Sequence, residues 1–425
     1  MPTLNSSLPN PKDIFRAELS NGIVFLARAN FNAPSVSMGG YLPAGSISEA
    51  DEKLGLADFV AASLMRGTAF HNFDSIYNEL ESVGASLGFD SGSLNTHFGG
   101  RALTEDLPLL LRLLAESLQA PTFPRAEVER LRAQLLTGLS LREQDTSDMA
   151  ALHFDRMLYQ DHPYARPEDG FVETIQSITR KDLQDFHRRY YGPRGMVIAV
   201  VGAMEPRKAF DLAEKYLGGW SVPRQNTAAQ IPPIKPLAKT LRHHHVIADK
   251  SQSDIVIGMF APRRADEDFF PASLGNSILG RFGMMGRIGA SVREKAGLAY
   301  SASSSLHAGV TVGSWEVDAG VNPKNLDKAI DLILKELKKF AARGVTKDEL
   351  AENQANYIGR LPLSLESNGG VASALLNLER YQLGLDYYPR YESFIRAVTR
   401  EQILEVARKY IDVDKLVIST AGPSQ

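Results

Sequence analysis

The chain has 425 residues, more than one ordinary core of roughly 100 to 200 residues holds, so the length favours two to four domains. Hydrophobic residues make up 44% and charged residues 23%, which is ordinary for a soluble globular protein and excludes collagen-like, disordered and disulfide-scaffold classes. The formal net charge of −3 gives no electrostatic attraction to nucleic acid or to an anionic membrane surface.

The sequence also limits metal chemistry and location. It contains no cysteine, so any metal would have to be held by His, Asp or Glu. The N-terminus has no basic stretch followed by an apolar stretch, as a secretion signal would. The longest apolar stretch, residues 196–204, has about half the roughly 20 residues needed to span a bilayer. These features predict a soluble, cytoplasmic protein that binds neither nucleic acid nor membrane.

Hydrophobic periodicity predicts both helices and strands. In chain order, it predicts strands at 23–29 and 35–42, helices at 109–118 and 128–141, strands at 254–259 and 314–320, and helices at 326–337 and 402–410. The elements intermix without a strict βαβ rhythm. The predicted fold class is therefore α+β, with a mainly antiparallel sheet in each half.

A proline-rich stretch divides the chain into two comparable halves. Pro223, Pro232, Pro233 and Pro236 predict an extended connector over 223–240, between an N-terminal domain at 1–222 and a C-terminal domain at 241–425.

The two halves repeat each other. The positions of Thr179 and Thr399 differ by 220, and each threonine precedes a predicted helix and a final apolar strand. Farther upstream the offset drifts to 222, where Pro124 lies over Thr346, as a small indel in a loop would produce. The halves are thus predicted to be homologous.

Residues 55–68, GLADFVAASLMRGT, resemble the zinc-site helix of the pitrilysin and insulinase metallopeptidases. In that family G-L-A precedes H-x-x-E-H, an apolar residue, a basic residue, Gly and Thr follow it, and the side chains of H-x-x-E-H hold zinc and activate water. The three corresponding positions here are Asp58, Ala61 and Ala62, and the family's third ligand, a glutamate, falls on Gly138. Glu143 lies five residues later, which rotates it by roughly 140° from the required helix face.

The resemblance therefore implies a degenerate zinc site. An alanine supplies no ligand, whereas a catalytic zinc needs about three protein ligands. The simpler interpretation of the helix itself is a plain amphipathic helix with an apolar core-facing side.

Residues 292–300, VREKAGLAY, resemble the family's C-terminal signature, in which an arginine precedes a tyrosine by seven positions. The resemblance implies that Arg293 and Tyr300 act on the substrate at the zinc of a partner's site. A tyrosine hydroxyl can stabilise an oxyanion, and an arginine offers five donors in a rigid fork. The alternative is that Arg293 complements a helix dipole and Tyr300 is a core aromatic.

Gly280, Gly283, Gly286 and Gly289 recur at every third position. This stretch resembles the glycine-rich loop of the non-catalytic subunit of mitochondrial processing peptidase, where the loop is linked to substrate handling. A phosphate-binding loop using Arg281 and Arg287 is a weaker interpretation, because neither G-x-G-x-x-G nor a G-K-[ST] ending is present. A flexible connection is the third alternative.

The nine histidines show no metal-ligand spacing. His243, His244 and His245 fall on a predicted strand, where neighbours point to opposite faces, so all three cannot share one metal. The remaining ones lack i,i+4 partners: His71, His97, His153, His162, His187 and His307. No histidine is assigned to a metal on these grounds.

The resemblance implies a catalytically incomplete subunit of a two-chain zinc peptidase. Its two homologous halves would form one part of a clam-shell, and it would carry no cofactor of its own. A paralogous partner with H-x-x-E-H would supply zinc, and the substrate would be a peptide or unfolded polypeptide. The isolated chain is expected to be inactive, and whether it forms a homodimer stays open. The alternative is a scaffold or peptide-binding homologue without any hydrolytic role.

Overall fold

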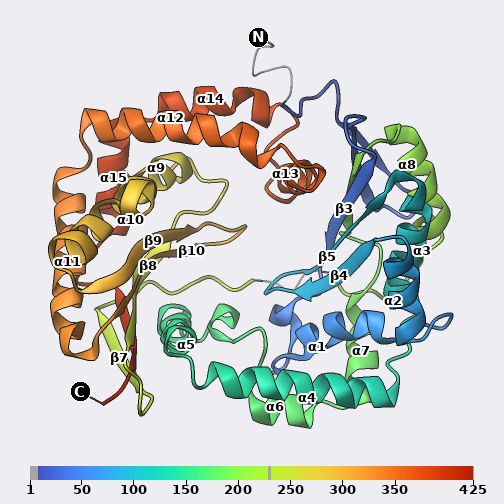
Figure 1. Ribbon diagram of the computed structural model, residues 1–425, viewed down its shortest axis with the longest axis horizontal. Helices are drawn as coiled ribbons and strands as arrows, with labels where there is room; N and C mark the ends of the chain where they lie inside the picture. The colour runs from blue at the N-terminus through green and yellow to red at the C-terminus, as the bar shows by residue number, and fades with distance from the viewer. Residues whose placement is uncertain (1–7, 228–230, 425) are drawn as a thin grey trace. The chain divides into compact units, whose positions relative to one another are not determined.

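The computed structural model describes residues 8–227 and 231–424. Each half of the sequence contributes one sheet (Figure 1). The strands of the first are β1 (Phe15–Glu18), β2 (Val24–Ala29), β3 (Ser35–Leu42), β4 (Ser86–Ser91), β5 (Thr96–Leu103) and β6 (Val197–Gly202). Those of the second are β7 (Leu241–Val246), β8 (Ser253–Ala261), β9 (Ala299–His307), β10 (Gly313–Val321) and β11 (Val417–Gly422).

Both sheets are mainly antiparallel, as the sequence predicts. The first has the order β1-β2-β6-β3-β5-β4 and the second the order β7-β11-β8-β10-β9. Among the strands of the described residues, only β2 with β6 and β7 with β11 pair in parallel. Together with the helices, these sheets confirm the α+β fold class.

The helices of the first sequence half are α1 (Leu56–Ser63), α2 (Phe73–Ser82), α3 (Leu107–Gln119), α4 (Arg125–Arg142), α5 (Thr146–Tyr159), α6 (Val172–Ser177), α7 (Arg180–Tyr190) and α8 (Pro206–Ala213). Those of the second half are α9 (Phe269–Gly280), α10 (Phe282–Gly289), α11 (Leu326–Arg343), α12 (Lys347–Ser364), α13 (Asn368–Arg380), α14 (Tyr387–Ala397) and α15 (Arg400–Tyr410). Within the described residues, no helix has the length and apolar character needed to cross a membrane.

The helix bounds confirm the repeat. The bounds of α7 and α15, and those of β6 and β11, differ by 220 in residue number at both ends, and the bounds of α4 and α12 differ by 222. Thr179 and Thr399 both form capping boxes with the third residue of their helix, Asp182 and Gln402. The local sequence therefore determines the same helix start twice.

The chain forms two compact units that are not continuous in sequence. Unit 1 runs to Leu139 and includes Pro167–Ile231 and Pro362–Pro389, while unit 2 contains Ser140–Arg166, Pro232–Leu361 and the chain from Arg390 onward. The boundaries 1–222, 223–240 and 241–425 stay a prediction of which stretches are homologous, because compactness does not test homology.

Two equivalent helices are exchanged between the repeats. Helix α5, from the first half, belongs to unit 2 and packs on β8 and β11; its counterpart α13, at an offset of 222, belongs to unit 1 and packs on β3 and β6. At both contacts a strand glycine lets a side chain of the helix approach the sheet closely. A Cβ on Gly258 would lie 2.8 Å from Cζ of Phe154, and one on Gly39 would lie 3.3 Å from Cδ1 of Leu376. Each sheet is thus covered by a helix from the other half of the sequence.

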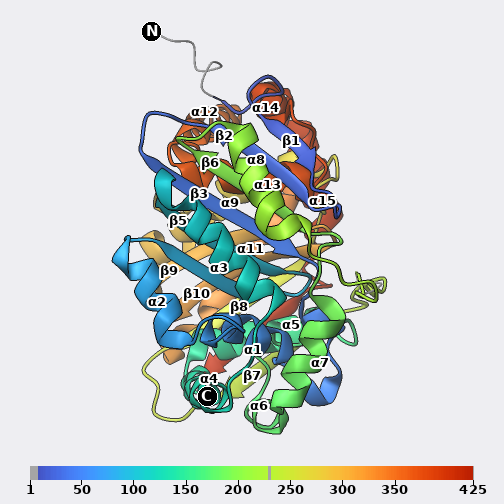
Figure 2. The same ribbon diagram turned by 90° about the vertical axis from the view of Figure 1, so that its right-hand side faces the viewer.

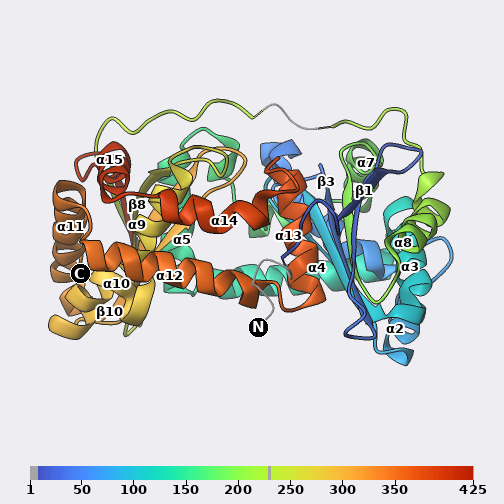
Figure 3. The ribbon, with the colours of Figure 1, turned by 90° about the horizontal axis from the view of Figure 1, so that it is seen from above.

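The remaining helices complete each core. In unit 1, α3 and α8 lie over the six-stranded sheet (Figure 2). In unit 2, α12 and α14 run alongside each other (Figure 3), where the Gln354 side-chain amide donates to the carbonyl oxygen of Ile395 at 2.9 Å. Both units therefore bury a core large enough to hold exposed site residues in place.

Candidate functional site

Helix α1 carries the positions that correspond to the family's zinc helix. It begins after Gly55, which has φ +89° and whose Cβ would lie 2.7 Å from the Ile175 side chain, so glycine is required there. The buried Glu49 carboxylate accepts hydrogen bonds from the backbone N–H groups of Gly55 at 3.1 Å and Ala57 at 2.5 Å. The G-L-A stretch therefore has a structural role that needs no metal.

The donor set on α1 and α4 does not fit zinc. Ala61 is 2% exposed and Ala62 packs against the core of unit 1, so two of the three helix positions offer only methyl groups. Gly138 lies exposed on α4 and has no side chain. Asp58 alone could donate, and one carboxylate cannot replace about three ligands.

Asp58 is unusual for a different reason. It is half-buried, and burial raises its pKa to about 6, with the negative charges of Asp169, Glu168 and Asp90 acting in the same direction. Because the folded chain disfavours the ionised form of this carboxyl group, ionisation of Asp58 lowers the stability of the fold. Where the family's histidine would bind a cation, this carboxyl group lies among other acids.

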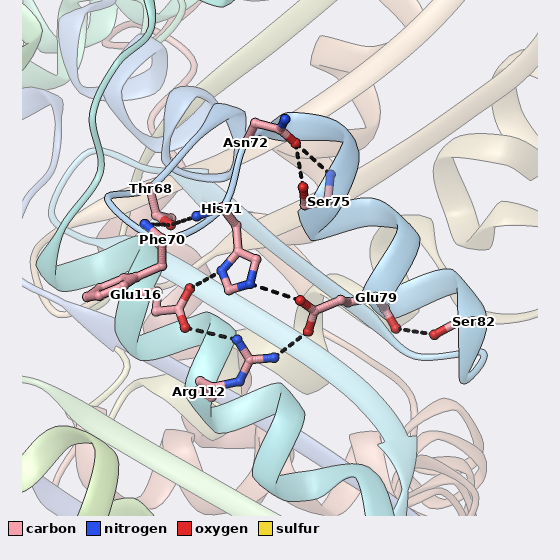
Figure 4. Close-up of polar contacts among 9 residues, drawn as sticks. All are labelled: Thr68, Phe70, His71, Asn72, Ser75, Glu79, Ser82, Arg112 and Glu116. Carbon is pink, nitrogen blue, oxygen red and sulfur yellow. Dashed lines mark hydrogen bonds and ion pairs between the residues drawn. The ribbon is translucent and has the colours of Figure 1, made fainter.

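The R-G-T stretch after α1 leads into a charged network (Figure 4). The Thr68 hydroxyl accepts from the backbone N–H of His71 at 3.0 Å, which positions the imidazole. His71 Nδ1 lies 2.7 Å from Glu116 and Nε2 lies 2.9 Å from Glu79. Arg112 bonds both carboxylates. The network joins α2 to α3, so this histidine has a structural role that its sequence position does not indicate.

The structure distinguishes between the two interpretations of Tyr300. Its side chain is 88% exposed at the start of β9, so it is not a core aromatic. Arg293 is half-buried in a π-helical turn, Ala290–Lys295, that follows α10 directly. Both residues lie in unit 2, and neither side chain has a hydrogen bond or ion pair with another described residue. An exposed phenol and a partly buried guanidinium are therefore available to a molecule outside this chain.

The four glycines do not form a loop, and that part of the prediction is wrong. Gly280 ends α9, and Gly283, Gly286 and Gly289 belong to α10. Gly283 and Gly286 have φ values of +63° and +62°, which glycine adopts without strain. A Cβ on Gly280 would lie 2.4 Å from the backbone nitrogen of Ser304, so close packing against β9 also requires a glycine. Periodicity could not show this, because glycines at every third position carry no apolar pattern.

Arg287 is engaged within unit 2. Its guanidinium bonds both carboxylate oxygens of Glu349, at 2.8 and 2.6 Å, and donates to the carbonyl of Gly344 at 3.0 Å. Burial would raise the pKa of Glu349, but the Arg287 bonds outweigh it and lower that pKa to about 2. This pair anchors α10 to α12 and removes Arg287 from any phosphate-binding role.

Comparison with known proteins places the chain in a family. A family model described as "Insulinase (Peptidase family M16)" matches residues 24–168, and one described as "Peptidase M16 inactive domain" matches residues 177–357. The chain belongs to the insulinase family of peptidases. The two models together match most of it, in the order that the two signature stretches predict.

Relatives of this insulinase-family chain cover nearly all of it. An uncharacterized zinc protease of Mycobacterium tuberculosis is 28% identical over 377 residues, 88% of this chain and 85% of that protein. The mitochondrial-processing peptidase subunit beta of Saccharomyces cerevisiae is 25% identical over 384 residues, 87% and 82% of the two chains. A crystal structure described as a peptidase M16 inactive domain from Pseudomonas fluorescens superimposes with a TM-score of 0.90 at 26% identity, covering 97% and 98% of the chains.

One histidine cluster in this insulinase-family chain is not predicted by the sequence. His153 on α5 lies beside His243 and His245 on β7. Strand alternation separates His244 from its two neighbours, and it also places His243 and His245 on one face. No local pattern indicates His153, because α5 is distant from β7 along the chain and meets it only in the tertiary structure.

Proposed function

We propose that this chain is the subunit without catalytic zinc in a two-chain peptidase. The partner would be a paralogue with an intact H-x-x-E-H, which would supply the zinc that activates water. The substrate would be a peptide or an unfolded polypeptide. The proposal rests on one observation: helix α1, which corresponds to the family's zinc helix, lacks a set of metal ligands, while Tyr300 in the other unit is exposed.

Each residue would have a separate role in that assembly. The Tyr300 hydroxyl would donate a hydrogen bond to the oxyanion that forms when water adds to the peptide carbonyl. The Arg293 guanidinium would bind a substrate carbonyl or carboxylate through its fork of donors. Asp58, Ala61 and Ala62 would take no part, because one carboxylate and two methyl groups do not make up the roughly three ligands that a catalytic zinc needs.

The test is a reconstitution. This chain and a zinc-bearing paralogue encoded in the same genome would be purified separately, mixed, and assayed for hydrolysis of an unfolded polypeptide. Each chain alone is expected to be inactive and the mixture active. In the mixture, Tyr300→Phe should lower turnover by about 100- to 1000-fold without weakening assembly, the typical effect of losing one oxyanion donor.

A matched control separates chemistry from surface change. Tyr77 is also an exposed tyrosine, 36% exposed on α2, and Tyr77→Phe should leave turnover unchanged. Full activity of the Tyr300→Phe assembly would contradict the catalytic role. Assembly that binds peptide but never hydrolyses it, with any H-x-x-E-H partner, would favour the scaffold alternative.

A further inference from the structure

Three imidazole rings meet on one face of the second sheet. His243 and His245 are two residues apart on the edge strand β7 and so point to the same face. Helix α5 covers that face and contributes His153, whose ring centroid lies 4.2 Å from that of His243 and 4.8 Å from that of His245. One ring nitrogen from each of the three residues lies within 4.8 Å of the other two. Nε2 of His153 and Nδ1 of His245 lie 3.1 Å apart.

Packing alone does not require histidines at two of these places, whereas the third, His245, corresponds to Arg28 in the other repeat. In the other repeat, β2 pairs with β6 as β7 pairs with β11, so Leu26 opposite Ala199 corresponds to His243 opposite Ser419. The exchanged helices are offset by 222 in residue number, so Leu375 on α13 corresponds to His153 on α5. Leu26 and Leu375 are both fully buried. The same fold is thus built with an apolar pair in unit 1 and an imidazole cluster in unit 2.

The cluster is linked by a hydrogen bond between His153 Nε2 and His245 Nδ1, so one of these two nitrogens carries a proton. In a neutral imidazole that proton can move to the other ring nitrogen, which leaves both atoms free to bind a metal ion. The positive charge of Arg156 acts on His153 and opposes any bound cation, so the affinity would have to come from the three rings.

We propose that His153, His243 and His245 bind one divalent transition-metal ion of the zinc class through their ring nitrogens. Imidazole suits zinc, copper and nickel, whereas calcium and magnesium prefer oxygen ligands. Three protein ligands leave the fourth position of a tetrahedral site for a water molecule. His243 is exposed to solvent, so water can reach that position. The ion would link α5, from the first half of the sequence, to β7, from the second.

Binding one ion would require the three ring nitrogens to move closer together. Zinc–nitrogen distances of about 2.0–2.1 Å place two tetrahedral ligand atoms roughly 3.3 Å apart. The 3.1 Å pair is already near that spacing, and no pair would have to close by more than about 1.5 Å, since all three ligand atoms lie within 4.8 Å of one another. His244 takes no part, because its two ring nitrogens lie 2.9 Å from the Thr420 hydroxyl and 3.0 Å from the Pro423 carbonyl.

The experiment uses the full chain without an affinity tag, stripped with a chelator. Zinc chloride is titrated by calorimetry, and cobalt(II) is titrated by visible spectroscopy to report the ligand set. One equivalent of zinc is expected to bind, and X-ray absorption should show nitrogen and oxygen ligands at about 2.0 Å. Saturating zinc should also raise the melting temperature, since the ion binds only the folded state.

Two variants remove ligands without disturbing the fold. His153→Leu and His243→Leu install the residue that the other repeat has at the same place, and circular dichroism would confirm folding. Each should weaken zinc binding by more than the roughly 10- to 100-fold that an outer-shell change costs. His244→Ala and Asp58→Ala are the controls, and both should bind zinc as the unaltered chain does.

The outcomes separate this site from the proposed function. Absence of zinc binding, or binding that all three single changes His153→Leu, His243→Leu and His245→Gln leave intact, would overturn the metal site. Zinc lost in Asp58→Ala but kept in the histidine variants would instead place the metal on α1 and contradict the proposed function. Because the reconstitution assay measures hydrolysis and this one measures binding, either proposal can fail alone.

Discussion

The two repeats share one plan and differ where chemistry could enter. Unit 1 lacks ligands on α1 and has a buried leucine pair at Leu26 and Leu375, while unit 2 exposes Tyr300 and has imidazoles at the places that correspond to that pair. Helix starts, final strands and the exchanged helices are equivalent in both. The comparison teaches that the shared features are structural and that the differing side chains are where function should be sought.

The largest expected effect on stability concerns the buried leucine pair of unit 1. Leu375→Ala should lower the free energy of unfolding by about 2–5 kcal/mol, because it removes a fully buried side chain and leaves a cavity. The corresponding His153→Leu should change the metal-free stability by less than about 1.5 kcal/mol. Urea unfolding of both variants, without metal, is the measurement. A loss in His153→Leu as large as that in Leu375→Ala would show that the imidazole cluster stabilises the fold without a metal.

The next effect concerns the degenerate helix. The raised pKa of Asp58, about 6, means that the folded chain holds the proton more tightly than the unfolded one, so stability falls as pH rises from about 4 to 6. Asp58→Asn should therefore raise the free energy of unfolding by on the order of 1–2 kcal/mol at pH 8, and by little at pH 4.

Unfolding curves at the two pH values would measure this difference. Glu81→Gln, which removes an exposed carboxylate on α2, is the control for a change of net charge. A wild-type chain that is more stable than Asp58→Asn at pH 8 would indicate that Asp58 has a cationic partner when it is ionised.

The smallest effect should be the same in both repeats. Thr179→Ala and Thr399→Ala each remove a side-chain cap, and each should cost about 1 kcal/mol of unfolding free energy. Chemical denaturation of the two single variants tests the equivalence. A cost at one site that exceeds the other by more than about 1 kcal/mol would show that tertiary contacts, beyond the cap, differ between the repeats.

The sequence by itself determined several of the helices and strands, the duplication and the missing ligands. Hydrophobic periodicity and the Thr caps act over a few residues, so the predicted strand at 35–42 has the bounds of β3, and predicted helix 402–410 lies within α15. The family resemblance rested on G-L-A, R-G-T and the Arg293–Tyr300 spacing, and the family models match the same stretches. The sequence alone shows that Ala61 and Ala62 offer no metal ligand.

Only the tertiary structure decided which helix covers which sheet. The apolar face of α5 can pack on either sheet as far as its sequence shows, and long-range close packing against Gly258 places it in unit 2. The position of α5 in unit 2 places His153 beside His243 and His245. The tertiary structure also leaves Tyr300, at the start of β9, exposed to solvent. Contacts between residues far apart in the chain have no local signature, so both candidate chemical features of unit 2 depended on the fold.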